Sequence, residues 1–439
     1  MEKEKLGISQ YIDSHIIMRE KEKFKIGYLN LLEYFLKKYS SKDIYNKELF
    51  KLYIKKLVKE SEYKYNEEKL KEKIKVIKKI KFKNYKFFTY KYFFLIDCLY
   101  INSFLEEDKA KEIITELKQL FNKKESDKMD QLYNILYRNK SSTNFFIEKK
   151  QIEYWNKNKL FYSNDLKKIL ITANMSAGKS TLINALIGKK VTHTKNEACT
   201  SRIINIYSKA YDDQYDYKWE AQKLNLEYSK DEFEMEKQEN LTSDKNISTY
   251  FYSKELNKGR ICLIDTPGVN FSMDTTHREI AFKIIQKREF NKLIYVLNSE
   301  NIGTDDDNKW LKYIVENVDR EKLIFVVNKF DKYRSKEDSI SETVEEIKKD
   351  LKKIGIDKPI VCPISAYAGF LAKKCLTNQE LNEDEKDELE YLARKLNKNE
   401  YNLLKFYNHT MKVVESENKY EGLLRNSGIM SLEELILNN

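Results

Sequence analysis

Glycine and proline are almost absent from the first third of the chain. Among the 439 residues, no glycine lies between Gly27 and Gly178, and the first of the three prolines is Pro267. Both residue types end helices or impose turns, so little in this stretch interrupts a helix. Apolar residues recur there at helical spacing, which predicts an all-α domain of packed amphipathic helices over residues 1–160.

The cysteine patterns of a metal site or a disulfide framework are also missing. The five cysteines are scattered and form no CxxC pair, and no apolar signal core follows the charged start, so we expect a reduced, cytoplasmic protein. Lys and Arg number 81 against 70 Asp and Glu, a net charge of +11. Because these charges are interleaved, they indicate a lysine-rich composition, and we expect no nucleic-acid partner.

The most hydrophobic segment, Tyr85 to Leu105, is too interrupted by charge to span a membrane. Lys86, Lys91 and Asp97 divide it, and a charge near the bilayer centre costs about 3 kcal/mol. We expect this segment to be the central helix of the N-terminal bundle. Interfacial contact with an anionic membrane is the alternative.

From Leu166 onward, short apolar runs alternate with helical patterns. Such alternation predicts an α/β domain over residues 161–439, with a mostly parallel sheet covered by helices on both faces. Polar segments near 208–260 and 373–420 are expected to be helical insertions that face solvent or a partner. Ligands of such sheets bind at the carboxyl ends of the strands. The expected strands are Lys168–Thr172, Ile203–Tyr207, Ile261–Asp265, Lys292–Leu297, Lys322–Asn328 and Ile360–Ile364.

The first strand runs into a phosphate-binding loop. Gly178-Lys179-Ser180-Thr181 opens a helix, so backbone N–H groups of the loop point at a polyphosphate. Lys179 places a positive charge on the β- and γ-phosphates, and the Ser180 hydroxyl can ligate Mg²⁺. Ala173 stands where GxxxxGK[ST] has its first glycine, which predicts strain or a shifted loop. The residues expected to contact the nucleotide here are Asn174, Met175, Ser176, Ala177, Gly178, Lys179, Ser180 and Thr181.

Three further motifs directly follow expected strands. In Asp265-Thr-Pro-Gly268, the carboxylate is expected to hold Mg²⁺ and the glycine N–H to sense the γ-phosphate. In Asn328-Lys329-Phe330-Asp331, a carboxylate that accepts two N–H bonds from guanine predicts GTP rather than ATP, because adenine would leave the charge unpaired. Ser365-Ala366 matches a backbone-donor loop for the guanine O6.

Thr200 is the candidate switch threonine, whose hydroxyl completes the Mg²⁺ shell when the γ-phosphate is present. Thr192, Thr194 and Ser201 are the alternatives. Val269 follows Gly268 where small signalling GTPases carry a water-orienting glutamine. The attacking water must therefore be positioned by the phosphate loop, by the Thr200 segment or by a partner.

Together these motifs resemble the bacterial dynamin-like GTPases. The resemblance covers Leu166 to about Leu371, and it implies a P-loop GTPase that hydrolyses GTP to GDP with Mg²⁺. It also implies that two GTPase domains pair to stimulate hydrolysis, with a phosphate-loop residue and a monovalent cation replacing an arginine finger. The resemblance rests on Asn174 to Gly188, Cys199-Thr200, Asp265 to Asn270, Asn328 to Asp331 and Pro363 to Tyr367.

Site roles follow from the resemblance by position. Met175 stands where eukaryotic dynamins use glutamine, which argues against a side-chain role there. The residues implied as catalytic are Ser176, Lys179, Thr200 and Gly268. The residues implied as metal ligands are Ser180, Thr200 and Asp265.

The implied partners are a second copy of the chain, a second dynamin-like subunit, and an anionic membrane that the protein binds peripherally and remodels. No lipid-binding tip is expected, because the sequence ends at Asn439, where membrane-remodelling dynamins continue into a stalk. Two alternatives stay open. One is a GTP-binding scaffold with little turnover, and the other is an Era-like ribosome-associated GTPase.

Overall fold

The computed structural model describes most of the chain and divides it into two compact units. The helical unit comprises Met1–Ser163, Ala210–Tyr217 and Leu224–Glu227, and the sheet unit comprises Asn164–Lys209, Lys218–Lys223 and Tyr228–Asn439. The described residues are 6–58, 63–64, 68, 71, 90–139, 144–174, 176–192, 202–220, 223–229, 232–233, 244–268, 275–300, 303–334, 339–407 and 418–438.

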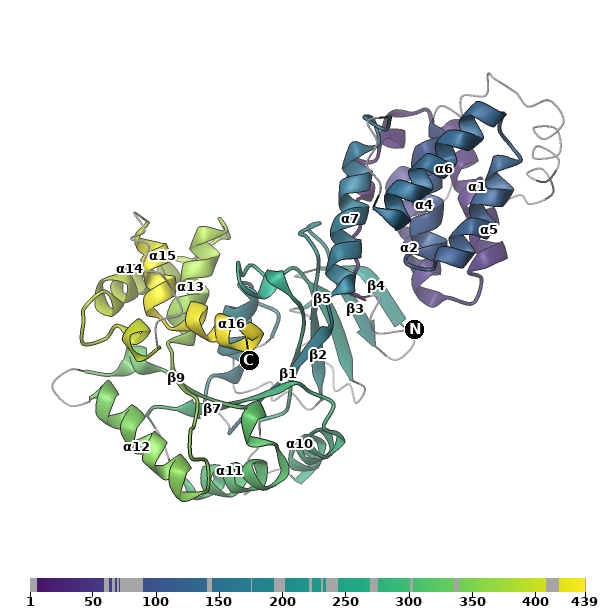
Figure 1. Cartoon of the computed structure of the whole chain (residues 1–439). Coiled ribbons are helices and arrows are strands. Elements are labelled where there is room, and N and C mark those ends of the chain that lie inside the picture. Colours follow the sequence, from purple (N-terminus) through teal and green to yellow (C-terminus); the bar gives the residue numbers. More distant parts are fainter. Residues whose placement is uncertain are drawn as a thin grey trace. The chain divides into compact units, whose positions relative to one another are not determined.

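The helical unit is organised around α4 (Lys91–Ser103), which contacts α1, α2, α5, α6 and α7. Every α4 residue from Phe93 to Ser103 is buried, which confirms the prediction of a central helix and leaves none of these residues for a membrane surface. Residues 85–89 lie outside the described chain. No described helix is both long and apolar enough to cross a membrane. The other helices of this unit (Figure 1) are α1 (Glu22–Tyr39), α2 (Ile44–Leu57), α5 (Glu107–Lys118), α6 (Lys123–Arg138) and α7 (Lys149–Ser163).

A buried carboxylate on α4 holds the N-terminal segment in place. Asp97 is fully buried and accepts hydrogen bonds from the hydroxyls of Tyr11, Tyr28 and Tyr53. His15 Nε2 lies 3.0 Å from its Oδ2 atom. Burial, together with the Asp97 charge, raises the pKa of all three tyrosines well above their usual value, so the hydroxyls stay protonated as donors. These bonds offset the cost of burying the charge.

The strand order of the sheet is β4-β3-β5-β2-β6-β1-β7-β8-β9. The central strand β1 pairs in parallel with both β6 and β7, and the sheet continues in parallel through β8 to β9. Strand β2 is antiparallel to β6. The strands are β1 (Leu166–Ala173), β2 (Ile204–Ser208), β3 (Asp216–Glu220), β4 (Lys223–Tyr228), β5 (Lys245–Thr249), β6 (Arg260–Asp265), β7 (Lys292–Asn298), β8 (Leu323–Asn328) and β9 (Val361–Pro363).

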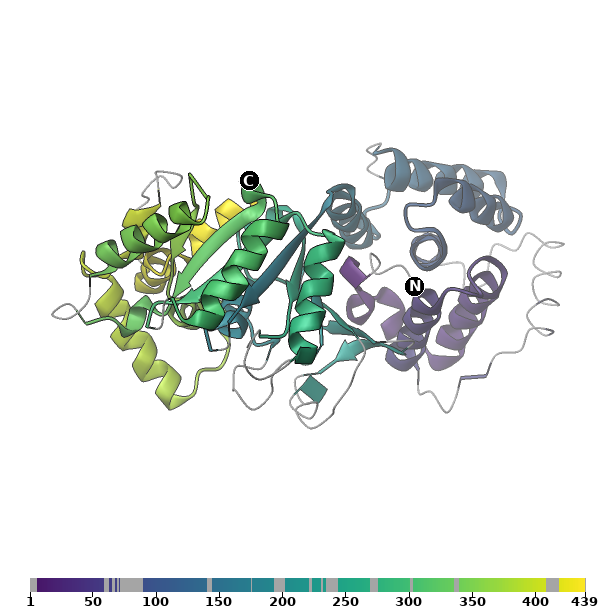
Figure 2. The ribbon, with the colours of Figure 1, turned by 90° about the horizontal axis from the view of Figure 1, so that it is seen from below.

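Helices cover both faces of this sheet, as predicted. One face carries α10 (Thr275–Lys287), α11 (Asp305–Asn317) and α12 (Ile340–Lys353), which are the green helices in front of the sheet in Figure 2. On the other face, α8, which starts at Lys179, packs against α13 and α16. The helices on this side are α8 (Lys179–Ile187), α13 (Ala366–Leu376), α14 (Glu383–Leu396), α15 (Lys419–Asn426) and α16 (Ile429–Asn438).

The prediction of a helical insertion near 208–260 is wrong for its described part, which contains β3, β4 and β5. All five residues of β5 are buried although four of them are polar. Lys245 donates to the Tyr228 hydroxyl at 2.8 Å, and the Asn205 side-chain amide donates to Asn246 Oδ1 at 3.1 Å. Two of the four polar residues are thus satisfied by partners distant in sequence, whereas the Ser248 and Thr249 hydroxyls have no hydrogen-bond partner among the described residues. Buried polar residues give the strand no apolar pattern from which its burial could be predicted. The segment near 373–420 does contain helices, chiefly α14.

Candidate functional site

The phosphate loop leaves the end of β1 and enters α8 through a left-handed glycine. Gly178, the residue before α8, has φ +86°, and a Cβ there would overlap the Asn328 side-chain amide. Ser176 also has a positive φ, of 62°. A side chain at position 178 would therefore be strained by its backbone and blocked by its neighbour, which explains the glycine. Met175 lies outside the described residues.

Lys179 and Asp265 meet at the carboxyl ends of β1 and β6. The two side chains are 8% and 0% exposed, and the ammonium group bonds Asp265 Oδ1. The register pairs Ile171 with Asp265, so the parallel strands bring the two motifs together. Burial raises the pKa of the Asp265 carboxyl, and the Lys179 charge opposes that shift.

The second oxygen of this carboxylate suits a metal ion. Asp265 Oδ2 is buried and has no hydrogen-bond partner in the described part of the chain. A carboxylate oxygen and a hydroxyl are ligands that Mg²⁺ prefers. Ser180, on the first turn of α8, would supply the hydroxyl. The donor set therefore fits Mg²⁺. Gly268 is half-buried just after β6, and Thr181 is half-buried on α8.

The expected switch threonine, Thr200, lies outside the described residues, as do Thr194 and Ser201. The remaining alternative, Thr192, is engaged elsewhere. Its hydroxyl donates to the Ser180 carbonyl at 3.1 Å and lies 3.2 Å from Asn184 Oδ1. Asn184 also accepts the backbone N–H of Thr192 at 3.0 Å. Thr192 thus anchors the chain leaving α8 rather than presenting a ligand.

Asn328 connects the base motif to the phosphate loop. Its side-chain amide donates to the Ala177 carbonyl at 3.1 Å, and its oxygen accepts the Ala366 N–H at 3.0 Å. One side chain therefore fixes two predicted nucleotide-binding loops. Lys329 adopts a left-handed conformation with φ 74°, and its ammonium lies 3.5 Å from a Glu300 oxygen.

Asp331 and Ser365 lie together at the ends of β8 and β9. The Ser365 hydroxyl donates to Asp331 Oδ1 at 2.7 Å and accepts the Ala368 N–H at 3.3 Å. Asp331 is 7% exposed. The serine thus fixes one carboxylate oxygen and leaves the second for another partner. A buried acid held in this way discriminates sharply between bases that can and cannot donate to it.

Sequence reasoning missed a buried lysine behind the phosphate-loop helix. Lys373 of α13 donates to the Leu186 carbonyl at 2.8 Å and pairs with Glu433 of α16. Burial lowers the pKa of Lys373 and raises that of Glu433. A cation at a helix C-terminus stabilises the helix. Nothing in the local sequence marks Lys373, because a lysine on an amphipathic helix is typical of a solvated face.

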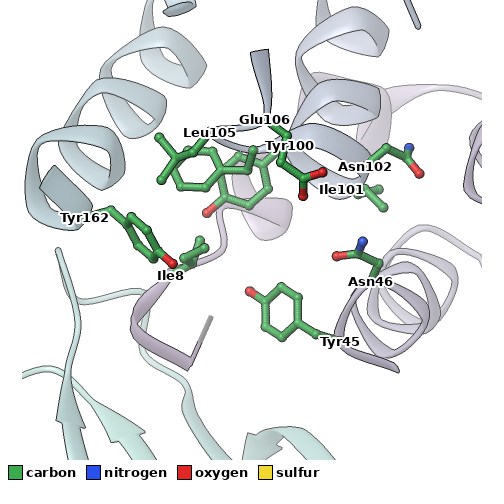
Figure 3. A pocket seen from close by; sticks show the side chains of 10 residues that line it. Ile8, Tyr45, Asn46, Tyr100, Ile101, Asn102, Leu105, Glu106 and Tyr162 are labelled. Carbon is green, nitrogen blue, oxygen red and sulfur yellow. The ribbon is translucent and has the colours of Figure 1, made fainter. Parts of the chain in front are cut away.

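The helical unit contains a pocket of about 140 Å³ that includes none of the predicted site residues. In Figure 3, the carboxylate of Glu106 and the amide of Asn46 point toward the space that Tyr45 and Tyr162 border. Its lining lacks the phosphate-binding loop and the base motif, so it takes no part in the nucleotide site described above.

Comparison with known proteins assigns the segment that carries the site to a family. Residues 169–330 match the model described as the Dynamin family. The matched residues belong to a P-loop GTPase domain of the dynamin family. This assignment confirms the recognition made from the motifs, and the GTPase domain has the predicted α/β fold. No curated protein matches the chain in sequence.

Three solved structures match the chain at low sequence identity and low TM-score. The G domain of the FeoB iron transporter of T. maritima is 18% identical with a TM-score of 0.25, covering 52% of this chain and 98% of that one. A bacterial dynamin, described as an oligomerised pair for long-range sensing and tethering of membranes, is 18% identical with a TM-score of 0.39. It covers all of this chain, which spans 64% of its length. Era Y63A of Aquifex aeolicus, bound to GDP.AlF4-, is 20% identical with a TM-score of 0.28. The match covers 50% of this chain and 58% of that one.

Proposed function

We propose that this GTPase hydrolyses GTP to GDP with Mg²⁺ and that pairing of two GTPase domains stimulates the reaction. The observation that carries the proposal is the convergence of Lys179 and Asp265 at one strand end, with Asp331 and Ser365 at the ends of β8 and β9. The dynamin family match favours this function over the Era-like alternative. The division into a helical domain, 1–160, and a GTPase domain, 161–439, is part of the proposal.

The phosphate chemistry follows from the paired side chains. Lys179 exchanges Asp265 for the β- and γ-phosphate oxygens, and backbone N–H groups at the start of α8 bind the phosphates. Ser180 and Asp265 would hold Mg²⁺, with Thr200 as the further ligand, and the bound ion neutralises charge on the phosphates. Gly268 senses the γ-phosphate through its N–H. Ser176 positions the attacking water and a monovalent cation.

The base is chosen by groups at the ends of β8 and β9. Asp331 accepts two N–H bonds from guanine, and the Ala366 loop donates to the guanine O6. Asn328 holds this loop and the phosphate loop in a fixed relation through its two amide atoms. The base and the phosphates are therefore bound by one connected network.

Specific GTPase activity is expected to rise with protein concentration, because a second copy, or a second dynamin-like subunit, completes the catalytic site. The measurement is phosphate release per mole of protein over a wide concentration range. Lys179→Ala serves as the blank at each concentration. Flat, negligible turnover despite GTP binding would instead support the scaffold alternative.

A peripheral role at anionic membranes, including remodelling, is the second candidate function. Phe146 is 85% exposed and Ile147 is 66% exposed, and the exposed Lys149 and Lys150 follow them. Apolar side chains beside lysines suit an interface of acyl chains and anionic headgroups. We propose that this protein is cytoplasmic and binds the anionic membrane surface through these residues.

Co-sedimentation with anionic vesicles, with and without GTP, tests this candidate. We expect the double variant Phe146→Ser, Ile147→Ser to lower the pelleted fraction several-fold, with neutral phosphatidylcholine vesicles as the control. Absence of pelleting by the unmodified protein on anionic vesicles would rule out membrane binding.

A further inference from the structure

Lys395 is a buried lysine whose ammonium group lies against the base motif. It belongs to α14 and is 8% exposed. Its Nζ atom donates to the backbone carbonyls of Asp331 and Tyr333, both at 2.7 Å. The ammonium also lies 4.8 Å from the ring centroid of Tyr401. Burying an ammonium group is energetically unfavourable unless its N–H groups make hydrogen bonds. Here they donate to the loop that carries Asp331.

The loop that Lys395 holds is locally unfavourable. Lys329 has a left-handed backbone, which residues with a side chain seldom adopt. The short helix η9 (Phe330–Lys332) follows directly. Such a conformation persists only where surrounding groups determine it. Hydrogen bonds from outside the loop therefore decide where the Asp331 carboxylate lies.

Asp331 is fixed from two sides. Ser365 donates to its side-chain Oδ1 atom, and Lys395 donates to its main-chain carbonyl. The serine orients the carboxylate, and the lysine sets the position of the backbone from which the carboxylate extends. Acceptance of two parallel N–H bonds depends on both, because hydrogen bonds weaken steeply as they bend.

We propose that Lys395 is a positioning residue for guanine selectivity. By holding the carbonyls of Asp331 and Tyr333, it places the Asp331 carboxylate so that both N–H groups of the guanine edge can donate to it. The inference rests on the proposed recognition of guanine by Asp331. It would also give α14 a role at the nucleotide site, in addition to the solvent-facing or partner-facing role expected for residues 373–420.

The test compares GTP with ITP, whose base lacks the 2-amino group and so makes one bond fewer to Asp331. Dissociation constants of the full chain with Mg²⁺ are measured for both nucleotides. Lys395→Met keeps the length of the side chain but removes the donors. Because hydrogen bonds to a charged group are strong, we expect this variant to lower the preference for GTP over ITP by about tenfold. Lys395→Arg retains donors and is expected to keep most of the preference.

Two matched controls separate positioning from general damage. Lys398→Met removes an exposed lysine just beyond α14 and should leave both constants unchanged. Lys373→Met removes a buried lysine that contacts α8. It should weaken the binding of GTP and ITP equally, so the ratio of their dissociation constants should not change. Thermal unfolding checks that each variant is folded. If Lys395→Met does not fold, Lys395→Gln, with a shorter neutral donor, replaces it and should lower the ratio less.

A wild-type GTP to ITP ratio in the folded Lys395→Met or Lys395→Gln variant would overturn the inference, whatever happens to absolute affinity. Failure of the underlying proposal looks different. In that case the unmodified protein shows no preference for GTP over ITP, and Asp331→Ala leaves the ratio unchanged. A ratio that falls with Asp331→Ala but not with Lys395→Met rejects the role of Lys395 alone.

Discussion

Lys179→Ala is expected to lower the rate of GTP hydrolysis by about 10³-fold or more, to the limit of detection, since a positioned cation on the transferred phosphate contributes this much. The ammonium is buried at the phosphate loop beside Asp265, where low local dielectric strengthens its interaction with phosphate oxygens. GTP affinity should fall as well, because the lysine contacts the nucleotide before the reaction.

The same substitution should also destabilise the protein without nucleotide. It leaves Asp265 fully buried without its cation, and breaking a buried ion pair costs about 3 kcal/mol. The raised pKa of Asp265, caused by burial, allows the carboxyl to take up a proton and recover part of this loss. Single-turnover hydrolysis and thermal unfolding measure the two effects. Lys190→Ala, an exposed lysine beyond the other end of α8, is the control, and unchanged hydrolysis in Lys179→Ala would refute the site assignment.

Asp331→Asn is expected to change the base selectivity of the protein from guanine to xanthine. In the unmodified protein the Ser365 hydroxyl donates to Asp331 Oδ1 at 2.7 Å. Asparagine keeps an oxygen that can accept this bond. The new NH₂ group then replaces the oxygen that faces the base. It opposes the N–H donors of guanine but can donate to the C2 carbonyl of xanthine. A site built on such bonds rejects a mismatched base strongly, so we expect GTP affinity to fall by about 10³-fold and XTP to bind instead.

Competition of labelled GTP by XTP, ITP and ATP measures this exchange. Asp357→Asn changes an exposed acid outside the site and should leave all affinities unchanged. Wild-type GTP affinity in Asp331→Asn would show that this carboxylate does not read the base. Hydrolysis of XTP by the variant would show that the phosphate machinery around Lys179 is intact.

Much of the site could be predicted because its motifs are local. A strand, a turn and a helix start suffice to place Lys179 at a phosphate loop, and Asp265 and Asp331 each follow an apolar strand directly. The carboxyl ends of parallel strands lie at one edge of a sheet, so the order of the motifs predicts their convergence. The same holds for α4, whose apolar run matches its burial.

Tertiary structure alone decided the positions of the buried polar groups. The strand β5 is polar in sequence, yet all five of its residues are buried, and Lys245 and Asn246 are hydrogen-bonded to side chains on other strands. Asn328 joins two loops, and Lys395 reaches the base motif from α14, 64 positions away from Asp331. A hydrophobic pattern reports burial only when burial is driven by apolar surface. A polar side chain that is buried because a distant partner satisfies it leaves no periodic signal, so only the folded chain reveals it.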